Sequence, residues 1–143
     1  MEGMKKLLIA TLAALLFFLQ SKDEIDLDNK ETLDEIIAEA IDMDKLQERG
    51  QKGEKLLYAP NEQTPYTGWV YEIGRRGNGQ KDILLQLKDG KPDGLLAMFH
   101  ENGQKYMEGR CKDGEKEGLW MYWEADGTES KRETFKDGIS VRN

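Results

Sequence analysis

The sequence is poor in the residues that build most catalytic and metal sites. It has one cysteine, which excludes an intramolecular disulfide and a site made of several thiolates. It has one histidine, His100, which no second histidine or ligand cysteine accompanies. We therefore expect His100 to be a solvent-facing turn residue rather than a metal ligand or a general base.

Positive charge is also in the minority. The 143 residues include 21 Lys+Arg and 28 Asp+Glu, a formal net charge of −7. This balance argues against a nucleic-acid backbone or an anionic bilayer as the main partner. The acidity is concentrated in residues 22–65, which hold 6 basic and 13 acidic side chains, whereas residues 66–143 are nearly balanced.

No motif indicates catalysis or a bound cofactor. His100 and Cys111 belong to no readable Ser/His/Asp or Cys/His arrangement. The stretch RRGNGQ, residues 75–80, has neither the glycine spacing nor the lysine of a phosphate loop. Asp26 and Asp28 lack the glycine and the closing glutamate of a calcium loop. We expect no catalytic residue, no metal and no cofactor.

The chain has a single long apolar run, Leu7–Leu19, behind a short basic head and ahead of the charged residues that start at Lys22. This order is typical of an export leader, which we predict over residues 1–21. Thirteen helical residues rise about 20 Å, less than the roughly 30 Å of a bilayer core, so a membrane anchor or a buried helix is the weaker alternative. The sequence around Gln20 does not determine whether the leader is cleaved. The predicted location is the periplasm or cell envelope, or the cytoplasm if the leader is not used.

An acidic segment, residues 22–55, follows the leader. The pattern Thr32-x-x-Glu35 fits a capping box, and it precedes apolar residues at helical spacing. We predict a helix from about Thr32 to Gln47 whose acidic face is solvated. Its apolar stripe consists of Leu33, Ile36, Ile37, Ala40 and Ile41.

A repeat with a period of 24 residues occupies the rest of the chain, residues 56–143. Each period carries two Asn-Gly or Asp-Gly dipeptides, which accept positive φ at both positions of a two-residue hairpin turn. We predict an antiparallel meander of three units, residues 66–91, 92–116 and 117–139. The dipeptides are Asn78-Gly79, Asn102-Gly103 and Asp126-Gly127 in one series, and Asp89-Gly90, Asp113-Gly114 and Asp137-Gly138 in the other.

Alignment of the units predicts which side chains are buried. The second strands align Leu87, Cys111 and Phe135, so we interpret Cys111 as a small core residue rather than a reactive thiol. Nine alternating positions of the first strands are all apolar or aromatic and should form the buried face. They are Trp69, Tyr71, Ile73, Leu95, Ala97, Phe99, Leu119, Met121 and Trp123.

The opposite face of the first strands is also largely apolar, which would leave a large exposed patch unless something covers it. One candidate cover is the stripe of the predicted helix. The other is a partner protein, for which large apolar side chains would serve as anchors. The predicted partner-binding residues are Val70, Leu96, Met98, Trp120 and Tyr122.

The units GLLAMFHENGQKYMEGRCKDGEKE and GLWMYWEADGTESKRETFKDGI resemble the MORN-repeat variant of bacterial proteins labelled as YwqK-family antitoxins. The resemblance covers about residues 56–139. It implies a curved antiparallel sheet that serves as a recognition surface without catalysis. The chain departs from this family in lacking a leader cysteine and in having Leu95-Leu96-Ala97-Met98 where aromatic residues are usual.

The sequence therefore predicts a mainly β, non-enzymatic repeat protein of the bacterial cell envelope that binds another protein. Nucleic acid is not an expected partner, and any membrane association is confined to the leader. The alternative is an antitoxin that neutralises a toxin by direct protein binding.

Overall fold

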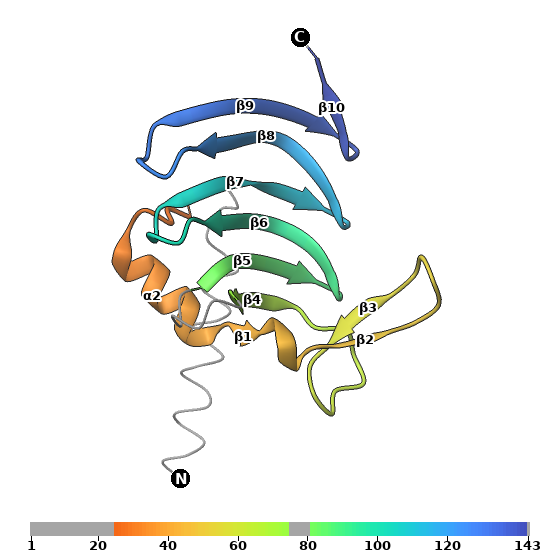
Figure 1. Ribbon diagram of the computed structural model, residues 1–143. Helices are drawn as coiled ribbons and strands as arrows, with labels where there is room; N and C mark the ends of the chain where they lie inside the picture. The colour runs from red at the N-terminus through yellow and green to blue at the C-terminus, as the bar shows by residue number, and fades with distance from the viewer. Residues whose placement is uncertain (1–24, 75–80, 143) are drawn as a thin grey trace. The chain divides into compact units, whose positions relative to one another are not determined.

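The computed structural model describes residues 25–74 and 81–142 (Figure 1). The chain divides into two compact units, Met1–Asp34 and Glu35–Asn143. The described residues are mainly β, as predicted, with one α-helix and a long antiparallel meander. The predicted leader, residues 1–21, and the predicted turn at Asn78-Gly79 lie outside the described residues.

The elements follow one another in a simple order. They are α2 (Lys30–Glu39), β1 (Ile41–Asp42), the 3₁₀ helix η1 (Met43–Lys45), β2 (Gln47–Arg49), β3 (Leu56–Tyr58), β4 (Gly68–Ile73), β5 (Lys81–Lys88), β6 (Lys91–Phe99), β7 (Lys105–Lys112), β8 (Glu115–Trp123), β9 (Glu129–Lys136) and β10 (Ile139–Val141).

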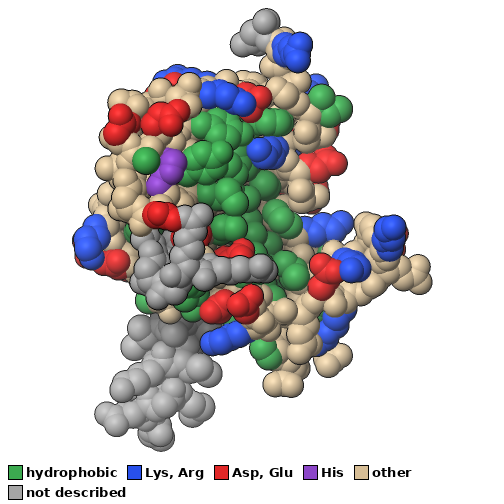
Figure 2. Space-filling model, in the orientation of Figure 1, with side chains coloured by type: hydrophobic (Ala, Val, Ile, Leu, Met, Phe, Trp, Pro, Cys, Tyr) green, Lys and Arg blue, Asp and Glu red, His purple; other side chains and the backbone are tan. Residues whose placement is uncertain are grey.

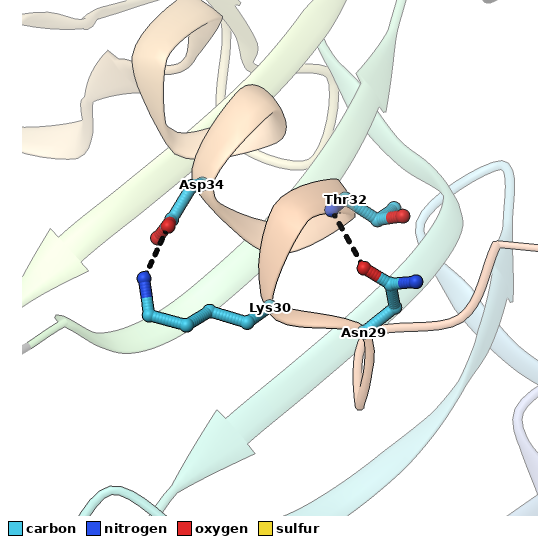
Figure 3. Close-up of polar contacts among 4 residues, drawn as sticks. All are labelled: Asn29, Lys30, Thr32 and Asp34. Atoms are coloured by element: carbon cyan, nitrogen blue, oxygen red, sulfur yellow. Dashed lines mark hydrogen bonds and ion pairs between the residues drawn. The ribbon is translucent and has the colours of Figure 1, made fainter.

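Helix α2 starts two residues earlier than predicted, because Asn29 and not Thr32 provides the N-cap. The Asn29 Oδ1 atom accepts a hydrogen bond from the Thr32 backbone N–H at 3.2 Å, which satisfies one of the unpaired donors of the first turn (Figure 3). Lys30 and Asp34 form an i,i+4 ion pair along the same turn.

The same helix ends at Glu39, well short of the predicted Gln47. Ile41 and Asp42 instead form β1, which runs parallel to β4 opposite Val70 and Tyr71. The Asp42 carboxylate then accepts a hydrogen bond from the Asp44 backbone N–H at 3.0 Å and begins η1. The apolar spacing at Ile41 was compatible with a helix, but pairing with a distant strand decided its conformation.

The main sheet has eight strands in the order β1-β4-β5-β6-β7-β8-β9-β10, and every pair except β1–β4 is antiparallel. From β4 onward the spatial order is the chain order, as Figure 1 shows. Strands β2 and β3 form a separate two-stranded sheet.

The Asp-Gly turns are confirmed as two-residue turns with positive φ at both positions. The φ values are 49° and 77° at Asp89-Gly90, 50° and 88° at Asp113-Gly114, and 49° and 77° at Asp137-Gly138. Each turn also forms hydrogen bonds with residues 20 to 24 positions earlier in the chain. The glycine N–H groups of the three turns donate to the carbonyl oxygens of Tyr66, Pro92 and Lys116 at 2.8, 2.7 and 3.0 Å, in chain order. The aspartate N–H groups donate to the side chains of Thr67, Asp93 and Glu117 at 2.9, 3.3 and 2.9 Å.

The turns at Asn102-Gly103 and Asp126-Gly127 differ from the prediction, because only their glycines have positive φ, 86° and 87°. The His100 carbonyl accepts from the Gly103 N–H at 2.9 Å, and the His100 N–H donates to the Gln104 carbonyl at 2.8 Å. This pattern is that of a three-residue loop. The Asn102 Oδ1 atom accepts a hydrogen bond from the Gln104 N–H at 3.1 Å, which stabilises this loop. The loop of residues 124–128 repeats the same bonds.

A hydrophobic cluster of Val70, Leu85 and Leu87 forms the core at the β4 end of the sheet. The residues packed against it come from β1, η1, β3, β5, β6 and the segments beside them. Ile41 is the stripe residue that takes part, and it does so from strand β1. The packed residues are Ile41, Met43, Leu46, Leu57, Tyr66, Ile83 and Leu96.

Candidate functional site

Two faces of the sheet have to be distinguished. We call the face that carries Trp69, Leu95 and Leu119 the first face, and the face that carries Val70, Leu96 and Trp120 the second face. The strand register carries the second face across the sheet, because Val70 pairs with Leu85, Leu85 with Leu96, and Leu96 with Gly109.

The first face is buried at some positions and exposed at others. Trp69, Leu95 and Ala97 are 8%, 4% and 0% exposed, as predicted. Leu119 is 51% exposed and Ile73 is 39% exposed, so the prediction that the whole column is buried was wrong at these positions. In the third unit the buried side chain is Trp120, its neighbour on the second face.

Trp120 is fully buried because the opposing residue is a glycine. A Cβ atom placed on Gly109 would lie 2.2 Å from the Trp120 ring carbon Cδ2, so no side chain other than hydrogen fits beneath the indole. The indole Nε1 atom donates to the Arg110 carbonyl at 3.1 Å. The unit before has Leu85 and Leu96 in these two places, so a small–large pair replaces two residues of similar size. The repeat alignment contains this signal, because Gly109 and Trp120 stand 24 residues after Leu85 and Leu96.

A row of side chains, half-buried except for the exposed Lys131, runs along the second face beside Trp120. We call it the outer row. It crosses five strands through consecutive pairs, since Ile83 pairs with Met98, Met98 with Met107, Met107 with Tyr122, and Tyr122 with Lys131. Figure 2 shows hydrophobic side chains gathered over the strands of the sheet. Four of the five members are apolar or aromatic, so the row is a partly exposed apolar strip.

Aromatic contacts extend the outer row at its edge. Tyr106, which is 44% exposed, packs edge-on against Tyr122 with ring centroids 6.3 Å apart. His100 packs edge-on against Tyr106 at 5.2 Å, and its Nε2 atom donates to the Trp123 carbonyl at 2.8 Å. His100 is therefore half-buried and bonded to the next unit, which corrects the expectation of a solvent-facing turn residue.

Lys116 lies over the aromatic side chains of the third unit. Its Nζ atom is 4.3 Å from the Trp120 ring centroid, 4.8 Å from that of Phe135 and 5.8 Å from that of Tyr122. It also donates a hydrogen bond to the Tyr122 hydroxyl at 3.2 Å. Three rings and a hydroxyl thus hold the ammonium group in place on the second face.

A second lysine, Lys131, forms an ion pair at this surface. It pairs with Glu133 at 2.9 Å and lies 5.1 Å from the Tyr122 ring centroid. The hydrogen bond from Lys131 is the main reason that the pKa of the Glu133 carboxyl is below its usual value, with smaller contributions from Tyr122 and Lys116. One carboxylate therefore stands near two ammonium groups.

Cys111 is 8% exposed, and Leu87 in the same column is 2% exposed, which confirms that Cys111 occupies a core position. Phe135, the third member, is half-buried. Desolvation raises the pKa of the Cys111 thiol, with a smaller lowering from Lys116. A raised pKa keeps the thiol protonated near neutral pH.

All five residues predicted to bind a partner lie on the second face, but they differ in exposure. Val70 and Trp120 are 0% exposed and support the surface from within the chain. Leu96, Met98 and Tyr122 are half-buried, so part of each side chain meets solvent. That these residues bind a partner stays a prediction.

Two further searches covered the described residues. In residues 25–74 and 81–142, no three His, Cys, Asp or Glu side chains come together in a way that would hold a metal ion. Over the same residues, no helix has the length and apolar character needed to cross a membrane.

Comparisons of the chain with family models, with curated proteins and with solved structures found no match. The features above therefore come from the residues of this chain and from their geometry.

Proposed function

We propose that this chain is a non-enzymatic, protein-binding repeat protein that uses the outer row and the neighbouring aromatic side chains as its docking surface. The MORN-variant resemblance of residues 56–139, which implies a curved recognition sheet, points to the same activity. The observation that carries the proposal is the continuous run of half-exposed Met98, Met107 and Tyr122 across three adjacent strands. Apolar and aromatic side chains of this kind dominate protein interfaces.

The rigidity of the surface supports this proposal. Each Asp-Gly turn is hydrogen-bonded to residues 20 to 24 positions earlier in the chain, and Trp120 is packed onto Gly109 beneath the outer row. A surface held in this way loses little conformational entropy on binding, which favours affinity. The charged, paired residues beside it, such as Lys131 and Glu133, suit the polar rim of an interface.

The proposal can be tested with one surface variant and one matched control. Met98→Asp places a charge on the outer row, whereas Leu119→Asp places the same charge on an exposed apolar residue of the first face. Both variants and the native chain are used to capture proteins from the envelope and cytosolic fractions of the producing cell, followed by mass spectrometry. Circular dichroism first establishes that each variant is folded.

We expect a protein that is captured by the native chain and by Leu119→Asp, and lost with Met98→Asp. The fraction that contains it also tests the predicted cell-envelope location. Capture that is equal for all three chains, or that is lost only with Leu119→Asp, would contradict the assignment to the second face.

A further inference from the structure

Lys116 presents an ammonium group on the second face that is held mainly by aromatic rings. Among the described residues Lys116 takes part in no ion pair, and its contacts are three rings and the Tyr122 hydroxyl. Glu133, the nearby carboxylate, is paired with Lys131 at 2.9 Å. The cluster of Lys116, Lys131 and Glu133 therefore has one positive charge in excess, although the chain as a whole carries −7.

Alignment of the repeat shows that this lysine and its three rings occur together only once. At the position of Lys116 the second unit has Pro92, and the rings of Trp120, Tyr122 and Phe135 replace Leu96, Met98 and Cys111 at the same spacing of 24 residues. The other units have Tyr66 and Pro92 in place of the lysine, and they have no aromatic ring at the other three places. The backbone of the repeat therefore does not require this group of side chains.

A partner that covers the outer row also removes water from Lys116. The ammonium is fixed above Trp120 and bonded to Tyr122, which belongs to the row, so it cannot leave the surface without breaking these contacts. Burial of a charged group without a counter-charge is strongly unfavourable, whereas a carboxylate in reach converts it into a charge-assisted hydrogen bond.

We propose that Lys116 is an anchor for a carboxylate, and that the partner is a protein segment that presents an aspartate or glutamate between apolar side chains. The apolar side chains would lie on Met98, Met107 and Tyr122, and the carboxylate would accept from the Lys116 Nζ atom. This inference rests on the proposed function, because it names the chemistry of the partner for the same surface.

The probe for the test is a random library of twelve-residue peptides displayed on phage and selected on the full chain. The best peptide is then synthesised in two forms, one with its acidic residue and one with the corresponding amide. Affinities for both forms are measured by calorimetry with the native chain, with Lys116→Met and with Lys136→Met. Methionine keeps an unbranched stem over Trp120, and Lys136 is an exposed lysine outside the cluster.

We expect an acidic residue flanked by apolar residues in the selected peptides. The amide form should bind the native chain and Lys136→Met about 10- to 100-fold more weakly than the acidic form, because a hydrogen bond to a charged group is lost. With Lys116→Met the two forms should bind equally. Thermal unfolding of the variants, followed by circular dichroism, establishes that each is folded.

The outcomes separate the two proposals. Selected peptides without an acidic residue, or a difference between acid and amide that persists in Lys116→Met, overturn the carboxylate anchor and leave the docking surface standing. If selection enriches no peptide on the native chain, both proposals fail.

Discussion

Strands β5 and β9 occupy the same place in the repeat but have opposite surroundings. Residues 84, 85 and 87 of β5 are leucines that are 1%, 6% and 2% exposed. The residues 48 positions later are Arg132, Glu133 and Phe135, which are exposed or half-buried. Both strands end in an Asp-Gly turn whose aspartate has a φ of 49°. The turns therefore set the course of the backbone, and contacts with other segments decide which strands become core.

The charged end of the sheet has a physical advantage. A strand beside the open edge exposes backbone donors and acceptors that invite pairing with other chains, and charged side chains discourage such pairing. β9 carries the ion pairs Glu129–Arg132 and Lys131–Glu133, while β10 covers its last three residues. The leucine-rich β5 has strands on both sides and does not need this protection.

The largest expected effect comes from making the third unit resemble the second. Gly109→Leu should destabilise the chain by about 3 kcal/mol, because the new side chain overlaps the fully buried Trp120 ring. The double variant Gly109→Leu/Trp120→Leu copies the Leu85 and Leu96 pair and should recover most of this loss. Urea denaturation measures the free energy of unfolding of each. A double variant no more stable than Gly109→Leu alone would show that the two sites are not packed against each other.

A second pair of variants compares the two ends directly. Leu87→Ala removes a side chain that is 2% exposed and should cost about 3 kcal/mol, within the range for leucines in cores. Phe135→Ala, at the matching position of the third unit, should cost about 1 kcal/mol, because the ring is half-buried and a lysine covers it. Urea denaturation again reports both values. Equal losses would mean that both ends of the sheet contribute equally to the core.

The turns provide a smaller effect that should not depend on burial. Gly114→Ala forces a residue with a Cβ atom to a φ of 88°, at a cost of about 1–2 kcal/mol. Gly138→Ala has the same local strain at a φ of 77°, but its turn connects only to the three residues of β10. We expect a global loss for the first variant and local fraying of β10 for the second, which hydrogen exchange distinguishes. Global unfolding by Gly138→Ala would show that β10 is part of the core.

The smallest effect concerns pH. Burial raises the pKa of Cys111, so the folded chain holds this proton more tightly than the unfolded chain. The corresponding stability is fully present below the unfolded pKa of about 8.5 and is lost as the pH rises through the folded pKa. Between pH 8 and about 9, where tyrosines with a pKa of about 10 remain mostly protonated, the native chain should lose stability slightly faster than Cys111→Ala. Parallel pH profiles of the two chains would disprove this coupling.

The role of the candidate site could be anticipated only in part. The alternation of apolar residues placed Leu96, Met98 and Tyr122 on one face, and the structure has them there. It did not show that Trp120 would be fully buried, because its burial depends on Gly109 in the neighbouring strand. It also did not show that Lys116 would lie over three rings, because these rings come from two strands that meet only in the sheet.

The sequence by itself determined the Asp-Gly turns, the chain-order meander and the core position of Cys111, because these depend on a few neighbouring residues and on a repeated spacing. The tertiary structure decided where helix α2 ends, which segment covers Val70, and which side of the third unit is buried. These outcomes depend on contacts between segments that are distant in the chain, such as β1 with β4. Local sequence patterns do not determine such contacts, since the same apolar residue can be buried from a helix or from a strand.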